Sequence, residues 1–160
     1  MRSWIAGGIG VLAAVLVFSL LRPLSAPADL IMDVFSVAVL IFGTLEGEVS
    51  GAVFGAVCGL IVDAFSLGVF GLAGLSLTPG GFLAGYVSRK INIQSVFRTF
   101  VFFAVLAVGM FAAWAGLTVL VGRSLLPWSG GLIALRPVVS AVAASVIYEG
   151  IRRIKARHER

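Results

Sequence analysis

The sequence has few charged residues and few chemically reactive side chains. Only 12% of its 160 residues are Asp, Glu, Lys or Arg, about half the share found in soluble domains. Its one cysteine, Cys58, excludes a disulfide framework and a metal site built from several cysteines. Its one histidine, His158, lies in the charged tail, and no Walker lysine, nucleophile elbow or zinc-ligand spacing occurs. We therefore predict a protein that is not an enzyme and that holds no cofactor and no metal.

Hydrophobic residues, by contrast, make up 60% of the chain. A soluble protein of this size could not bury so much apolar surface, whereas the interior of a bilayer is itself apolar. The apolar runs do not alternate with polar residues, as the strands of a membrane barrel do. The composition predicts an all-α integral membrane protein, with residues 1–160 forming a single polytopic domain.

Six segments are apolar enough, and about long enough, to cross a bilayer as helices, which takes about 20 residues each. Prolines, glycines and charged residues separate them, and "SLG" (66–68) favours a tight hairpin between the third and fourth over one re-entrant unit. The first segment has an alternative, because Arg2, the apolar run and "SAPA" (25–28) resemble a secretory signal. The length of the run favours a retained helix. The predicted spans are 4–21, 28–45, 48–67, 69–87, 97–121 and 132–151.

The basic residues indicate the orientation of these spans. With both termini in the cytoplasm, nine Lys and Arg residues fall inside and three outside, as the positive-inside rule requires. Basic residues at span ends are not the pattern of a nucleic-acid-binding surface. We expect those of the fourth span and of the tail 152–160 to contact anionic lipid head groups, with a cytoplasmic partner protein as the alternative. These residues are Arg89, Lys90, Arg152, Arg153 and Lys155.

A row of glycines marks the third predicted span. Gly47, Gly51, Gly55 and Gly59 recur every four residues, which places them along one ridge of a helix. Each glycine costs a helix in water about 1 kcal/mol relative to alanine, but in lipid small residues let two helix backbones approach closely. The row predicts a helix-packing face, within the monomer in preference to a partner interface. The fourth span carries a shorter match, Gly81 and Gly85.

Asp63 occupies the next step of the glycine row, so we expect it to face protein and not lipid. A buried acid near the end of a helix needs a partner. The free N–H groups at the start of the next span would serve, as would Arg22, Arg123 or Arg136. The acid then either caps the hairpin or has a proton or ligand role. Asp33 also lies near the outer side, so Asp33 and Asp63 form a candidate polar cluster.

Residues 27–91, "PADLIMDVFSVAVLIFGTLEGEVSGAVFGAVCGLIVDAFSLGVFGLAGLSLTPGGFLAGYVSRKI", resemble the bacterial rod-shape-determining membrane protein family MreD. The resemblance comprises a proline and an acid that open the second span, a "GLLLDLLSG"-like end of the third, a Phe-Gly pair and a "GYLAG"-like exit followed by basic residues. Here "FSLG" (65–68) replaces the usual serine-glycine after the acid. The matched residues are Pro27, Asp29, Gly59, Leu60, Asp63, Ser66, Gly68, Phe70, Gly71, Gly85, Tyr86, Arg89 and Lys90.

The resemblance implies a non-enzymatic scaffold of the Rod complex, or elongasome, which builds the lateral peptidoglycan wall of rod-shaped bacteria. Its implied location is the bacterial cytoplasmic (inner) membrane. Implied partners are MreC, bound directly, the glycosyltransferase RodA, a class B penicillin-binding transpeptidase and MreB filaments. The family is also similar in its six-helix fold to the S-components of energy-coupling-factor transporters.

Two other functions remain as alternatives. A substrate-binding, S-component-like subunit of a vitamin transporter would need a polar pocket, for which Asp33, Asp63, Ser76 and Thr78 are the available groups. An intramembrane aspartyl enzyme would need both Asp33 and Asp63 within reach of one substrate.

Overall fold

The computed structural model describes residues 29–65, 71–91, 95–122 and 130–158, and the side chains of 34–65, 71–91, 95–122 and 136–154. The described residues form helices joined by short turns and contain no strand, which confirms the predicted all-α class. The predicted first span, 4–21, and its alternative as a signal sequence lie outside the described residues. The helices are α2 (Asp29–Glu46), α3 (Glu48–Phe65), α4 (Leu72–Lys90), α5 (Val96–Leu120) and α6 (Gly130–His158).

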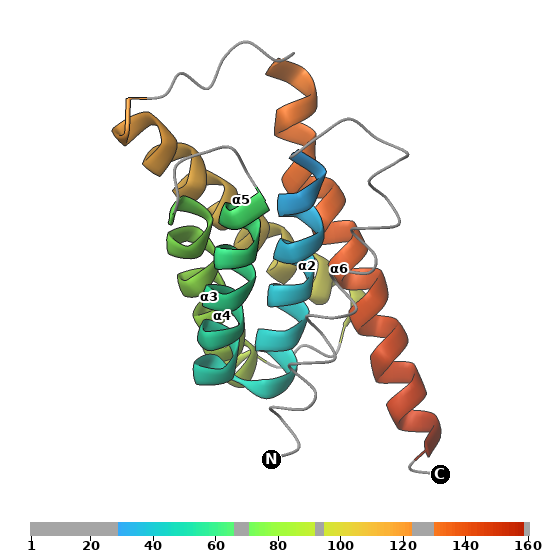
Figure 1. The fold of residues 1–160 in the computed structure, drawn as a ribbon. Helices are drawn as coiled ribbons and strands as arrows, with labels where there is room; N and C mark the ends of the chain where they lie inside the picture. The colour runs from blue at the N-terminus through green and yellow to red at the C-terminus, as the bar shows by residue number, and fades with distance from the viewer. Residues whose placement is uncertain (1–28, 66–70, 92–94, 123–129, 159–160) are drawn as a thin grey trace.

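Successive helices run in opposite directions and pack side by side (Figure 1). The α3–α4 pair makes the most extensive contact, α2 packs against both, and α5 and α6 pack on each other and on α4 and α2 respectively. The α2–α3 turn, the end of α4, the start of α5 and the end of α6 all lie at one end of the bundle, which we call the basic end (lower end in Figure 1). Arg89, Lys90, Arg98, Arg152 and Arg153 belong to this end.

The helix boundaries follow the predicted spans closely except at two places. α4 begins at Leu72 and not at 69, because Gly71 has a left-handed backbone (φ 101°) that cannot be part of a right-handed helix. It then continues to Lys90, since Lys and Arg favour helix and interact well with the negative end of the helix dipole. For the same reason α6 continues past 151 through the basic tail to His158.

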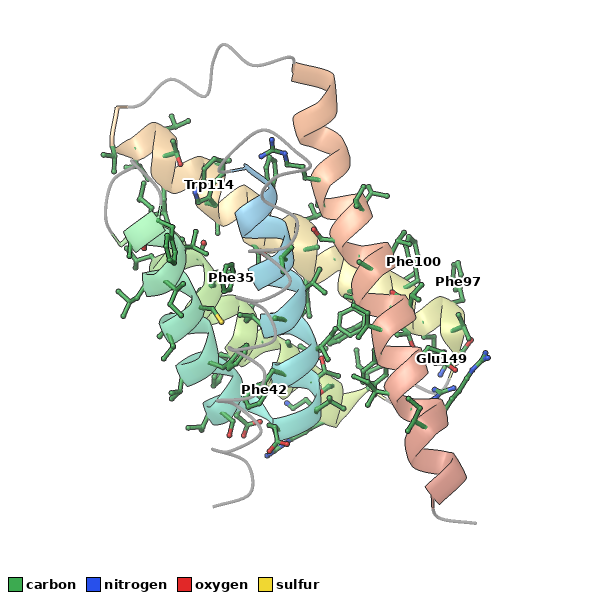
Figure 2. All side chains as sticks on the ribbon, turned by 45° about the vertical axis from the view of Figure 1, so that its right-hand side comes forward. Phe35, Phe42, Phe97, Phe100, Trp114 and Glu149 are labelled. Atoms are coloured by element: carbon green, nitrogen blue, oxygen red, sulfur yellow. The ribbon has the colours of Figure 1, made fainter. Side chains whose placement is uncertain are left out.

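Large apolar side chains fill the space between the helices. Phe35 and Leu40 of α2, Leu77 of α4 and Phe103 of α5 are fully buried. The rings of Phe42 and Phe54 stack at 4.3 Å and join α2 to α3. Figure 2 shows Phe35 and Phe42 along α2. The core therefore lies along α2, between the α3–α4 hairpin and the α5–α6 pair.

The outward faces of the helices are apolar as well. Val49 is 70% exposed, Phe97 74% and Leu120 84%, and exposed valines and leucines follow the outer faces of α3, α5 and α6. Among the described residues, α3 and α5 are each long and apolar enough to cross a bilayer, and Val34–Glu46 of α2 is a shorter apolar segment. Of the five predicted spans that fall in the described residues, two thus meet this standard of length and composition.

Candidate functional site in the α3–α4 hairpin

The glycine row of α3 lies directly against the backbone of α4. A Cβ atom added to Gly55 would overlap the carbonyl oxygen of Leu77 and lie 2.8 Å from its carbonyl carbon. One added to Gly59 would lie 2.6 Å from the backbone nitrogen of Gly74. Real Cβ atoms do not come so close to other heavy atoms, so only glycine fits at these positions. The missing side chains are what brings the two helices into backbone contact.

The contact is reciprocal and includes α2. A Cβ on Gly81 of α4 would lie 2.7 Å from the carbonyl carbon of Gly51, and one on Gly85 would lie 2.6 Å from the Cα of Glu48. On α2, a Cβ on Gly43 would lie 2.6 Å from the carbonyl oxygen of Gly81. Glycines of three helices therefore meet near Gly81. Gly81 and Gly85 of α4 lie against the start of α3 as the glycine row of α3 lies against α4.

Asp63 closes the other end of the hairpin. Its side chain is buried, with the residue 5% exposed. Oδ2 accepts hydrogen bonds from the backbone N–H groups of Gly71 (3.0 Å) and Gly74 (3.1 Å), and Oδ1 accepts one from Ala73 (3.1 Å). These N–H groups open α4 and have no partner within that helix.

The carboxylate therefore acts as an N-cap supplied by the preceding helix. The residue before α4, Gly71, has no side chain that could cap it. An anion at this position also faces the positive end of the α4 dipole. The contacts match the hairpin-cap alternative left open by the sequence. Of the arginines considered as partners, Arg22 and Arg123 lie outside the described residues, and Arg136 is part of α6.

Asp33, the other half of the candidate polar cluster, lies in the second turn of α2. Its side chain is outside the described set, so the cluster of Asp33 with Asp63 stays a prediction. Within the described ranges, no group of three His, Cys, Asp or Glu side chains is arranged as a metal site.

Each predicted basic contact whose side chain the structure describes has a partner within the chain. Arg89 lies 3.4 Å from Glu48, and Lys90 lies 4.5 Å from the centre of the Tyr86 ring. On α6, both arginines approach the same oxygen, Oε1 of Glu149: Arg152 at 2.9 Å and Arg153 at 3.7 Å. Glu149 and Arg153 have the i,i+4 spacing of a helical ion pair. Lys155 belongs to α6, and its side chain is outside the described set.

Sequence reasoning missed the role of Arg89 in the α2–α3 turn. The prediction that Gly47 belongs to the helical glycine row is wrong: it lies between α2 and α3, where its positive φ of 99° is not helical. A Cβ there would overlap the Arg89 guanidinium. The same guanidinium pairs with Glu48, so Arg89 ties the turn to the end of α4. The only signal in the sequence is a glycine between two glutamates, since the pairing joins residues 41 positions apart.

Most of the buried hydroxyl groups, and that of the half-buried Thr78, are used locally. Each donates to a carbonyl three or four residues earlier in its own chain, as helix-borne Ser and Thr commonly do. The distances run from 2.7 to 3.1 Å. The residues are Ser76, Thr78, Thr99, Thr118 and Ser145.

Comparison of the chain with protein-family models, curated proteins and solved structures found no match. The resemblance to MreD accordingly rests on the motif in residues 27–91 alone.

Proposed function

We propose that the protein is a non-enzymatic scaffold in the bacterial cytoplasmic membrane that supports lateral wall synthesis within the Rod complex, as the MreD resemblance implies. One observation carries the proposal. The Asp63 carboxylate is engaged in closing the α3–α4 hairpin, while the outer faces of the helices present apolar side chains. Such a surface favours contact with lipid and with other membrane helices.

The exposed apolar surface supports a place in the bilayer. Soluble monomers rarely expose contiguous apolar patches of more than a few hundred Å². Here exposed apolar side chains lie on the outer faces of three helices, with Val49 on α3, Val105 on α5 and Val146 on α6 each at least 66% exposed. In water this surface would drive aggregation, whereas in a bilayer it faces acyl chains.

The distribution of charge supports a cytoplasmic location for the basic end. The alternating helix directions bring together cations from α4, α5 and α6 that are far apart in the sequence (Figure 1). In a membrane, Lys and Arg concentrate on the cytoplasmic side. Arg136, by contrast, lies in the first half of α6, away from the basic residues at the end of that helix.

The same geometry disfavours the transporter alternative. A ligand pocket needs polar groups that converge on an open space and are available to a ligand. The Asp63 carboxylate accepts backbone N–H groups of α4, and the hydroxyls of Ser76 and Thr78 donate to carbonyls of their own helix. Three of the four groups available for such a pocket thus already have a partner within the chain. The aspartyl-enzyme alternative has the same difficulty, because Asp63 is engaged as a cap.

As a scaffold, the protein binds MreC directly and supports RodA and the class B penicillin-binding transpeptidase at sites of MreB filaments. The MreD resemblance supports these partners. The apolar outer faces of α5 and α6 fit a transmembrane helix, which such a partner would bring.

The test combines co-purification with a ligand screen. The chain is co-expressed with MreC, purified in mild detergent and, separately, screened against vitamins by thermal shift. We expect MreC to be recovered and no vitamin to raise the melting temperature. A vitamin-dependent shift without recovery of MreC would reject the scaffold in favour of the transporter subunit.

A matched experiment uses Asp63→Asn in cells that depend on the protein for rod shape. A scaffold role predicts that whatever fraction of the variant folds supports rod shape in proportion to its amount. Loss of rod shape at wild-type levels of folded protein would instead indicate a chemical role for the carboxylate.

A further inference from the structure

Three exposed side chains follow one another along α4 toward the basic end. Phe82, Tyr86 and Lys90 recur at four-residue spacing, which places them on one ridge of the helix, about 6 Å apart along its axis. The rings of Phe82 and Tyr86 stack with centroids 6.0 Å apart, and Nζ of Lys90 lies 4.5 Å from the centre of the Tyr86 ring. All three residues are exposed. They form one continuous surface, which we call the aromatic ladder.

The order of polarity along the aromatic ladder matches the edge of a bilayer. Phe82 is wholly apolar, Tyr86 has an apolar ring with a polar hydroxyl, and Lys90 carries a charge. Aromatic residues with one polar end concentrate at the membrane–water interface, and lysine extends its charge toward the head groups while its stem covers apolar surface. Lys90 makes no ion pair with a side chain that the structure describes. A head-group phosphate would pair with it, whereas an acidic soluble peptide would leave Phe82 in water.

With Tyr86 at one boundary of the hydrocarbon region, α4 is too short to reach the other boundary. Leu72, its first residue, is 14 residues from Tyr86, or about 21 Å along the axis. The hydrocarbon region is about 30 Å thick, and tilting the helix only reduces the depth that it covers. At the end opposite the basic end, α5 and α6 extend beyond the start of α4 (upper end in Figure 1). The start of α4 therefore lies about 9 Å or more short of the opposite boundary.

We propose that the aromatic ladder anchors α4 to phospholipid head-group phosphates, with Tyr86 at the cytoplasmic boundary of the hydrocarbon region, and that the Asp63 cap consequently lies inside this region. At that depth no water reaches the backbone N–H groups that open a helix, so each needs a partner within the protein. The Asp63 carboxylate accepts those of Gly71, Ala73 and Gly74. The depth thus accounts for a buried carboxylate at the end of an apolar ridge. This inference rests on the proposed bilayer location.

The test is the depth of spin labels on single introduced cysteines of the full chain in vesicles of phosphatidylcholine and phosphatidylglycerol. Depth is measured as the ratio of collisions with oxygen, which dissolves in the hydrocarbon, to collisions with a water-soluble nickel chelate. L75C, I91C and L120C each replace an exposed side chain, so the core stays unchanged. Cys58 is fully buried, and the wild-type chain measures any background labelling.

Leu75 and Leu120 are a matched pair, because each lies within a turn of the outer end of its helix. Leu75 is 11 residues from Tyr86, or about 16 Å, so the label of L75C should report the middle of the bilayer. The label of L120C, at the end of the 25-residue α5, should lie near the outer head groups. A label of L75C as close to head groups as that of L120C would place the start of α4 at the interface and overturn the inference.

Removal of the aromatic ladder tests the anchor itself. Y86L combined with K90Q should move the label of I91C from the head groups toward the hydrocarbon, by up to about 6 Å, the axial distance from Tyr86 to Lys90. R89Q is the matched control: it removes a neighbouring charge, but Arg89 is paired with Glu48, so the label should keep its depth. An equal shift in R89Q would mean that only net charge matters. An unchanged label in Y86L/K90Q would leave Lys90 to an acidic protein partner, and either result overturns the anchor.

The anchor and the proposed function fail in distinguishable ways. Flotation of the wild-type chain with the vesicles tests the bilayer location alone. Insertion with the label of L75C near a head-group boundary rejects the anchor and the depth of the cap, whereas no insertion into any vesicle rejects the proposed function as well.

Discussion

Replacing Gly55 by alanine tests whether backbone contact between α3 and α4 holds the bundle together. In an exposed helix the change is favourable by about 1 kcal/mol, because alanine is the better helix former. At Gly55 the added methyl group would overlap the Leu77 carbonyl oxygen and lie 3.1 Å from the Cα of Thr78. The atoms it meets belong to the backbone of a helix, so they cannot rotate away as a side chain would.

The size of the effect follows from the distances. An ordinary contact between carbon atoms needs about 3.5 Å or more, so the 2.8 Å separation from the Leu77 carbonyl carbon must open by about 0.7 Å. Overpacking of this kind costs about 1–3 kcal/mol. Subtracting the helix-propensity gain leaves Gly55→Ala between neutral and about 2 kcal/mol less stable than wild type.

Gly109→Ala is the matched control, because it is the same change in a helix where an added Cβ meets nothing within 4 Å. It should be stabilising by up to about 1 kcal/mol, so the two variants should differ by about 1–3 kcal/mol. The assay is equilibrium or thermal unfolding in detergent, with maleimide labelling of Cys58 as the readout. Cys58 is the one cysteine and is fully buried in α3. Equal stabilities of the two variants would refute the packing argument.

Three further outcomes are expected. Asp63→Asn should lose about 1–3 kcal/mol of unfolding free energy, because an amide has one acceptor oxygen where the carboxylate uses two, and Gly55→Leu should reduce the yield of folded protein more; a reversed order contradicts this. Cys58 should resist maleimide in the folded state and react on unfolding, and rapid labelling of folded protein would show that the helix face is open. Arg89→Ala should cost at most about 1 kcal/mol, since its pair with Glu48 is largely exposed; unfolding titrations would reveal a larger loss.

Local patterns made much of the fold predictable from the sequence. The four-residue glycine spacing placed Gly51, Gly55 and Gly59 on one ridge, and the structure sets that ridge against α4. Such a periodicity can be recognised in a sequence because the face on which each residue lies depends only on helix geometry. Charged and glycine-rich junctions likewise located the helix ends to within a few residues, apart from the long C-terminal extension of α6.

Contacts between residues far apart in the sequence were not predictable in the same way. Asp63 had candidate partners among both backbone N–H groups and arginines, and only the three-dimensional arrangement shows the N–H groups of Gly71, Ala73 and Gly74 at its oxygens. The Arg89–Glu48 pair depends on the turn direction at Gly47, which no residue spacing encodes.

Substitutions at two groups of glycines can distinguish effects on folding from effects on partner binding at the surface. Gly55 and Gly59 lie where a Cβ would meet backbone, whereas Gly109 and Gly116 of α5 lie where it would meet nothing within 4 Å. Substitutions in the first group should act through stability, and their effects on complex formation should follow the amount of folded protein. Substitutions in the second group leave the core untouched, so any loss of a partner there, with Cys58 still protected, would arise at the surface. Because the glycine row is engaged in packing within the hairpin, the partners of the proposed scaffold should be mapped on outward faces such as that of α5, and not on the glycine row.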